Sequence, residues 1–458
     1  MLYNNYTITI TERQAGGYPV SAMATDGGRV SATLPPTDAD LARLLSQVAL
    51  LPSRAGAEAI LLEAGVGLFH WLMVAPLETH FRVAWDRAEQ AGRGLRLRLT
   101  IDAPEINAWP WELLHDPSRD HAFGASVATP LMRYLDRVDQ FGLPMELATE
   151  LPLGLLLVIP QAPDLDLPRE RALIEQAIAP LTDALNLQVL EGVVTRTDLS
   201  DKLMAGHYEI VHFSGHGGFA DGRSYVCLNR PEGGADWADS SVIVRLFGNH
   251  LPLKLGVLNA CRTGQVDETK AFTGLALQLL RSGARAVVAM QYPLTDEAAL
   301  TFAREFYRQL CTGEHAGQVD VAVTHARNML AVLYGGDPSF IAPVLYTHAA
   351  DGVIFTLTKE AAVQDVLDPS SRRARLAMLV SSLQASMDFD EDWTPADRPK
   401  LEAWRETLKQ AESSYLIHVS DWRPEVRQVA QQGLALVRAR LASLETALAE
   451  AAGDRVTR

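Results

Sequence analysis

Cysteine is scarce in this chain of 458 residues. Its three cysteines, Cys227, Cys261 and Cys311, are widely spaced and odd in number, which excludes a disulfide-stapled scaffold and a paired-cysteine metal knuckle. Long apolar runs are also missing. The longest, Leu151 to Pro160, falls well short of the roughly 18 residues that a membrane-spanning helix requires. The sequence therefore predicts neither a membrane span nor a metal or cofactor site.

Basic charge is in deficit, and a secretory signal is not visible. Lysine and arginine number 41 against 56 aspartates and glutamates, for a net charge of −15. This balance argues against a long phosphate-tracking surface, although a local basic groove stays possible. The N-terminus, MLYNNYTITITER, has no basic segment followed by an apolar core. We expect a cytoplasmic protein that binds neither nucleic acid nor a membrane.

Apolar residues make up 48% of the chain and charged residues 21%, which is typical of a globular protein large enough for two to four domains. Residues 1–150 mix alternating strands and amphipathic helices and predict an N-terminal α/β module. In its strand Leu95–Ile101 we expect leucines inward and arginines outward, and we expect Trp109 and Trp111 to be buried. The other elements expected here are strands Tyr6–Ile10 and Arg29–Leu34, as partners, and helices Ala39–Leu51 and Arg82–Gln90.

Residues 151–357 alternate strand and helix. Strands separated by helices of about 10 to 15 residues predict a doubly wound, mostly parallel sheet. Such sheets bind ligands at the carboxyl ends of their strands. Residues 358–458 contain long helical patterns rich in Ala, Leu and Arg, and predict a helical regulatory or docking region. The expected strands of the middle block are Leu153–Ile159, Leu187–Val194, Tyr208–Gly215, Lys254–Ala260, Ala284–Gln291 and Asp351–Leu357.

Two of these strands end in reactive residues. Tyr208–Gly215 runs into His216, and Lys254–Ala260 runs into Cys261. If the strands are neighbours, about 4.8 Å apart, their tips bring an imidazole and a thiol to one crevice. A free thiol is only a few per cent thiolate at neutral pH, so Cys261 would attack a carbonyl while His216 accepts its proton and later donates one to the leaving amine.

Glycines after the histidine serve the same chemistry. Gly217 and Gly218 let the backbone approach a substrate closely, and we expect the amides of Gly217 and Cys261 to stabilise the developing oxyanion. A phosphate-binding loop is the competing interpretation of SGHGG. It is disfavoured because the GK[ST] tail is missing and no acidic residue lies about 20 positions downstream.

The two motifs also have a specific context. Caspases carry Q-A-C-[RQG]-G with the histidine about 50 residues upstream, and this chain has N-A-C-R-T-G with His216 45 residues before Cys261. Asn259 replaces the glutamine, and Thr263 precedes Gly264. Together with ARAVVAMQYPLTDEAA, this pattern resembles the CHAT family of caspase-like peptidases, which is related to separases. LRLRLTIDAPEINAWPWELLHDP is similar to the region that precedes the peptidase core in many CHAT proteins.

The resemblance implies a caspase-like fold and a His216–Cys261 dyad in a regulated cysteine endopeptidase. It further implies a bacterial defence or cell-death role, with gasdermin-like pore formers as one class of substrate. The TPR repeats that often accompany CHAT domains are missing from the sequence, which leaves the activator open. An inactive caspase-like interaction scaffold that recruits partners is the alternative.

The sequence offers several acidic residues for substrate specificity. Asp296, in the loop after ARAVVAMQ, is the first carboxylate expected beside Cys261, and Asp267 and Glu268 are further candidates. A carboxylate there would favour a basic residue before the cleaved bond. The competing interpretation is that Thr295 caps a helix and Asp296 complements its dipole. We expect His212, Cys227 and Cys311 to be non-catalytic.

Overall fold

The structure is a computed structural model, and the protein divides into two compact units, Met1–Leu357 and Thr358–Arg458. Each unit is described by itself. The residues that the structure describes are 1–50, 57–135, 147–162, 166–248, 250, 253–260, 274–281, 283–357, 401–402, 405, 408–409 and 424–451.

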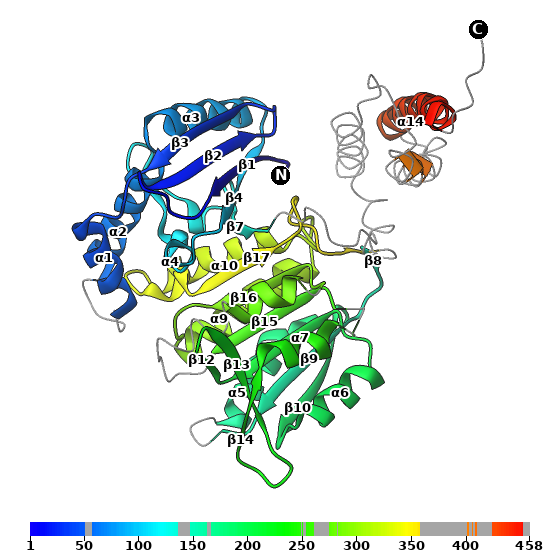
Figure 1. The fold of residues 1–458 in the computed structure, drawn as a ribbon. Coiled ribbons are helices and arrows are strands. Elements are labelled where there is room, and N and C mark those ends of the chain that lie inside the picture. The colour runs from blue at the N-terminus through cyan, green and yellow to red at the C-terminus, as the bar shows by residue number, and fades with distance from the viewer. Residues whose placement is uncertain are drawn as a thin grey trace. The chain divides into compact units, whose positions relative to one another are not determined.

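The first unit is built on one continuous sheet of 11 strands (Figure 1), in the order β10-β9-β11-β15-β16-β17-β7-β4-β1-β2-β3. From β10 to β16 all neighbours are parallel, and β17 runs antiparallel to β16. The strands of this half are β9 (Leu153–Pro160), β10 (Leu185–Gly192), β11 (Ile210–Gly215), β15 (Leu255–Ala260), β16 (Ala286–Met290) and β17 (Pro343–Thr347).

Helices cover both faces of this half, which explains why its strands are apolar on both sides. All eight residues of β9 are buried. One face packs against α5 (Leu167–Ile178), α9 (Asp296–Cys311) and α10 (Val319–Leu333). The other face packs against α6 (Arg196–Ala205), α7 (Ser240–Gly248) and a helix over residues 274–281. The predicted doubly wound, mostly parallel α/β fold is confirmed.

The N-terminal half of the unit continues the same sheet. Strand β7 pairs in parallel with β17 and with β4, so the ladder crosses from one half to the other without a break. Trp111 is fully buried, as predicted, whereas Trp109 is only partly buried where it packs against the core. The elements here are β1 (Tyr3–Ile10), β2 (Tyr18–Ala24), β3 (Arg29–Leu34), α1 (Ala39–Leu50), α2 (Ala57–Leu72), α3 (Ala75–Gln90), β4 (Gly94–Ile101), α4 (Pro104–Asn107), β5 (His115–Asp116), β6 (His121–Ala122) and β7 (Leu131–Tyr134).

Two predictions in this half were wrong. Arg29–Leu34 is a strand, but its partner is β2, which the sequence analysis missed and which itself pairs with β1. Arg96 does not face solvent: it is 4% exposed, and its Nε donates to Asp320 Oδ2 of α10 at 2.6 Å. The face of β4 that carries Arg96 is therefore covered by α10. The buried guanidinium is tolerated there because it forms an ion pair with Asp320.

The end of the middle block was also predicted incorrectly. The last strand of the large sheet is β17, whereas Asp351–Leu357 contributes only β18 (Thr356–Leu357), paired with β8 (Ala148–Thr149) in a separate small sheet. Ile354 and Phe355 are buried all the same. Their side chains belong to the core that also contains residues of α9 and α10, and the Ile354 N–H donates to the Gly317 carbonyl at 2.9 Å.

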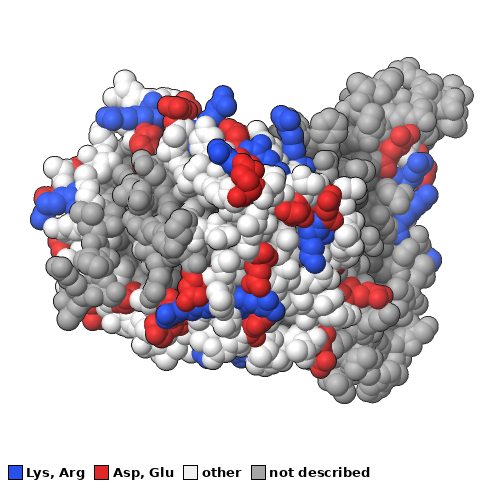
Figure 2. All heavy atoms as spheres, turned by 90° about the horizontal axis from the view of Figure 1, so that it is seen from below, with Lys and Arg blue, Asp and Glu red and all other residues white. Residues whose placement is uncertain are grey.

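A three-stranded meander follows β11 and consists of β12 (Gly217–Ala220), β13 (Arg223–Asn229) and β14 (Ala235–Asp239). In the second unit the structure describes α14 (Pro424–Ala451). Within the described parts no single helix is long and apolar enough to cross a membrane, and α2 with α3 passes that test only as a pair bent by 103°. Basic and acidic side chains are intermixed on the described surface in Figure 2.

Candidate active site

The sheet order changes direction at the carboxyl ends of β9 and β11. From β9 the chain passes through α5 to β10 on one side, and it then crosses through α6 to β11 on the other side. This reversal is a topological switch point, where the loops after the two strands diverge and open α/β folds bind ligands. His216 directly follows β11 and is partly buried there.

The two strands that carry the predicted dyad are neighbours. β11 and β15 pair in parallel, and the last residues in register are Gly215 and Ala260. His216 follows the first and Cys261 follows the second. Cys261 itself lies outside the described residues, as do Asp267 and Glu268. The register brings the chain positions before both dyad residues to adjacent points, about 4.8 Å apart, at one edge of the sheet.

Pairing with β13 fixes the backbone around His216. The His216 carbonyl accepts from the Cys227 N–H at 2.9 Å, so Gly217 and Val226 form a non-hydrogen-bonded pair of the β12–β13 ladder. In such a pair the N–H and C=O of each residue point away from the partner strand. The Gly217 amide, predicted as an oxyanion donor, is therefore directed to the outer edge of β12.

Helix α5 is bonded to β11 just before the histidine. The buried Ser214 donates from Oγ to Glu170 Oε2 at 2.8 Å. Glu170, His212 and Asn259 line a small cavity between the strand ends and the apolar side chains of α5 and α9. The sequence analysis missed these buried polar side chains. Their only signal in the sequence was the polar residue at every second position of HFSG.

His212 is a core histidine, as predicted. It is 3% exposed, and its Nδ1 lies 2.8 Å from the Tyr307 hydroxyl. Among the described residues Nε2 has no hydrogen-bond partner. Burial lowers the pKa of His212 to about 4, because a charged imidazole would lose its hydration without gaining an anion. His212 is therefore neutral at physiological pH.

This histidine predicts a loss of stability in acid. The unfolded chain binds a proton at His212 below about pH 6.5, whereas the folded chain does not until about pH 4. The free energy of unfolding should fall between these limits, by about 3 kcal/mol in total for this group. In His212→Gln, denaturant titrations from pH 7 to 4 should show the wild-type advantage shrinking as the pH falls. Parallel curves for the two proteins would contradict this assignment.

Asp296 occupies the first turn of α9. The Thr295 hydroxyl accepts from the Ala298 N–H at 3.2 Å, which confirms the cap. The Asp296 carboxylate is 8% exposed and forms an ion pair with Arg169 near the start of α5, whose side chain is 51% exposed. Asp296 thus lies beside the switch point, and it is already paired with an arginine of this chain.

The two described cysteines are packed side chains, as predicted. Cys227 on β13 is 5% exposed, and Cys311 at the end of α9 is 1% exposed. Burial raises the pKa of the Cys311 thiol to about 12, so it stays protonated and weakly nucleophilic. Among described residues no group of three His, Cys, Asp or Glu side chains is placed to hold a metal ion.

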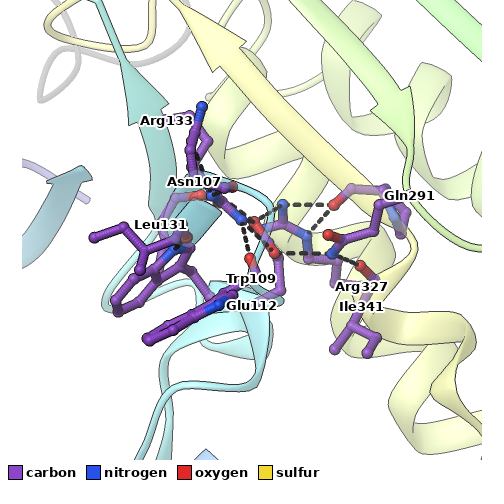
Figure 3. Close-up of polar contacts among 11 residues, drawn as sticks. Asn107, Trp109, Glu112, Leu131, Arg133, Gln291, Arg327 and Ile341 are labelled. Carbon is purple, nitrogen blue, oxygen red and sulfur yellow. Dashed lines mark hydrogen bonds and ion pairs between the residues drawn. The ribbon is translucent and has the colours of Figure 1, made fainter. Parts of the chain in front are cut away.

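A buried polar network joins the N-terminal half to the loop after β16 (Figure 3). Glu112 accepts from Arg133 Nη2 at 3.0 Å through one oxygen, and the same oxygen accepts from Gln291 Nε2 at 3.0 Å. Arg327 Nη2 lies 3.6 Å from the other oxygen. Gln291 directly follows β16, and its N–H donates to Ala342. The sequence analysis missed this network because its members are far apart in the chain.

The comparisons with known proteins identify the family. The family model of the CHAT domain matches residues 62–337. This chain belongs to the CHAT domain family. The matched range includes the switch point, the predicted dyad positions and much of the N-terminal half. The family match confirms the resemblance seen in the sequence. The CHAT domain family is of cysteine-peptidase type.

The similarity to solved structures is weaker than the match to the family model. The chain matches Saccharomyces cerevisiae separase in its complex with securin in two crystal structures, at 2.6 and 3.0 Å resolution, with TM-scores of 0.40 and 0.41 and identities of 14% and 13%. The match covers 75% of this CHAT chain and 30% of the separase chain in both. No curated protein matches the sequence significantly.

Proposed function

We propose that this CHAT protein is a regulated cysteine endopeptidase that cleaves a protein target with His216 and Cys261. The observation that carries the proposal is the parallel register of β11 and β15, whose last pair immediately precedes the two residues. The position of His216 at the topological switch point supports the same conclusion.

The chemistry follows from the proposed roles. The Cys261 thiol transfers its proton to His216 and attacks the scissile carbonyl, while the outward amide of Gly217 and the amide of Cys261 donate to the oxyanion. The C–N bond then breaks as His216 protonates the leaving amine. Water, deprotonated by the same imidazole, hydrolyses the thioester and regenerates the thiol.

The biological setting is proposed from the family resemblance. We infer a bacterial defence or cell-death response in the cytoplasm, with gasdermin-like pore formers as one class of substrate. Separase is found in complex with securin, and an activating or inhibitory protein partner is proposed here for the helical region 358–458. A peptidase core of 151–357 behind an N-terminal module of 1–150 remains our proposed division of the first unit.

A thiol-labelling experiment separates this peptidase from an inactive scaffold. A peptide carrying a thiol-reactive electrophile should label Cys261 stoichiometrically, because a neighbouring imidazole raises its thiolate fraction. His216→Ala should abolish the labelling, and Cys227→Ala should leave it unchanged, since that thiol is buried in β13. Mass spectrometry locates the adduct. Labelling that is independent of His216 would favour the scaffold.

We further propose a basic residue before the cleaved bond. Asp296 lies beside the switch point, and a substrate guanidinium could displace Arg169 from it through paired charge-assisted hydrogen bonds. Asp267 and Glu268 remain alternative carboxylates for this role. Profiling a peptide library should show an arginine preference that weakens in Asp296→Asn. An acidic or uncharged preference in the wild type, or an unchanged arginine preference in the variant, would reject Asp296.

A further inference from the structure

Trp237 on β14 is conspicuous because it is 48% exposed, whereas tryptophan is highly buried on average. Its ring lies on Gly218 of β12, where an added Cβ would stand 3.1 Å from Cζ3. Gly218 and Tyr225 are register partners, as are Cys227 and Trp237, so these positions share one face of the meander. The exposed Trp237 ring thus covers Gly218, which is two residues after His216 in the chain.

We propose that Trp237 and Gly218 form a subsite for an apolar or aromatic side chain on the leaving-group side of the scissile bond. The inference rests on the proposed peptidase function. His216 must reach the leaving nitrogen to protonate it, so groups that adjoin the histidine border the part of the substrate that departs. Gly218 is such a group, and Trp237 covers it.

The backbone of β12 supports this placement. Since Gly217 and Val226 are a non-hydrogen-bonded pair, the N–H and C=O of Gly217, and those of Phe219 two residues on, point away from β13. An extended substrate segment would hydrogen-bond along this outer edge, as peptides do at strand edges, with the buried Gly217 at its inner end and the half-buried Phe219 and exposed Ala220 at its open end. Its side chains on the Gly218 face would then contact the Trp237 ring.

Acyl transfer to added amines tests this subsite directly. A small ester acylates the Cys261 thiol, and the departing alkoxide takes its proton from His216. An added amine then attacks the thioester: the C–S bond breaks, an amide forms, and the amine proton passes through His216 to the thiolate. Competing phenylalanine amide against glycine amide measures recognition on the leaving-group side alone.

The wild type should transfer its acyl group to phenylalanine amide about five- to tenfold more than to glycine amide, the size expected of one aromatic contact. Trp237→Ala should lose this preference and Trp237→Phe should keep most of it. The control Met204→Ala removes an 84% exposed apolar side chain on α6 and should behave as wild type.

The outcomes separate the two proposals. Acylation with an unchanged amine preference in Trp237→Ala, or equal use of both amines by the wild type, overturns the subsite and leaves the peptidase proposal intact. No acylation of the wild type, or acylation that survives Cys261→Ala, overturns the proposed function and the subsite with it. Should Trp237→Ala fail to fold, the charged variant Trp237→Glu is expected to disfavour phenylalanine amide in the same assay.

Discussion

Replacing Cys261 or His216 by alanine should reduce peptide cleavage by at least about 10⁴-fold. The thiol is the proposed nucleophile and the imidazole its proton acceptor, and members of one catalytic unit show effects that do not add. The double variant should therefore be no slower than either single variant. Initial rates with a fluorogenic peptide, under the condition that gives wild-type cleavage, measure this.

Folding must be controlled for in that comparison. Circular dichroism and the denaturation midpoint should match the wild type for both variants, since each residue lies beyond the end of its strand. Cys227→Ala removes a different thiol, from β13, and should keep near wild-type rates. Full activity in Cys261→Ala or His216→Ala would contradict the dyad.

Replacing Glu112 by glutamine should destabilise the first unit by about 3–5 kcal/mol, because two buried arginines would lose the carboxylate that pairs with both of them. Arg133 and Arg327 are 2% and 0% exposed, and Glu112 is 1% exposed. Burial lowers the pKa of Arg327 to about 10, because its charge is poorly solvated. Denaturant unfolding followed by tryptophan fluorescence measures the loss.

A double-variant cycle distinguishes lost charge pairing from a general packing defect. Arg327→Met removes one of the two cations, so adding it to Glu112→Gln should cost less than it costs in the wild type. We expect a coupling of about 0.5–3 kcal/mol. Glu63→Gln, on the exposed side of α2, is the matched control and should have little effect. Strictly additive losses would show that the carboxylate does not stabilise the arginines.

The parallel part of the sheet, from β10 to β16, could be predicted because its signals are local. A continuous apolar segment such as Leu153–Ile159 indicates a parallel strand covered on both faces. The glycines after His216 indicate where β11 ends. The sequence analysis could only suppose that β11 and β15 are neighbours, and their pairing is established by the structure. The confirmed cap at Thr295 is likewise a signal within a few residues.

The features that the sequence analysis missed depend on contacts between distant segments. Arg96 alternates with leucines along its strand, as a surface residue does. It is buried only because α10 packs on β4. Strand β17 is a five-residue segment beginning with proline, and its neighbours β16 and β7 define it as a strand. No local pattern indicates that Glu112, Gln291 and Arg327 converge, because 179 residues separate the first two.

The pairing of β7 with β17 has a consequence for solubility. A sheet exposes unsatisfied N–H and C=O groups only at its outermost strands, and here those are β10 and β3. Without the N-terminal half, β17 would replace β3 as an outermost strand of the sheet, apolar on both faces and a template for pairing with another chain. The N-terminal half thus covers an edge of β17 that would otherwise favour edge-to-edge aggregation.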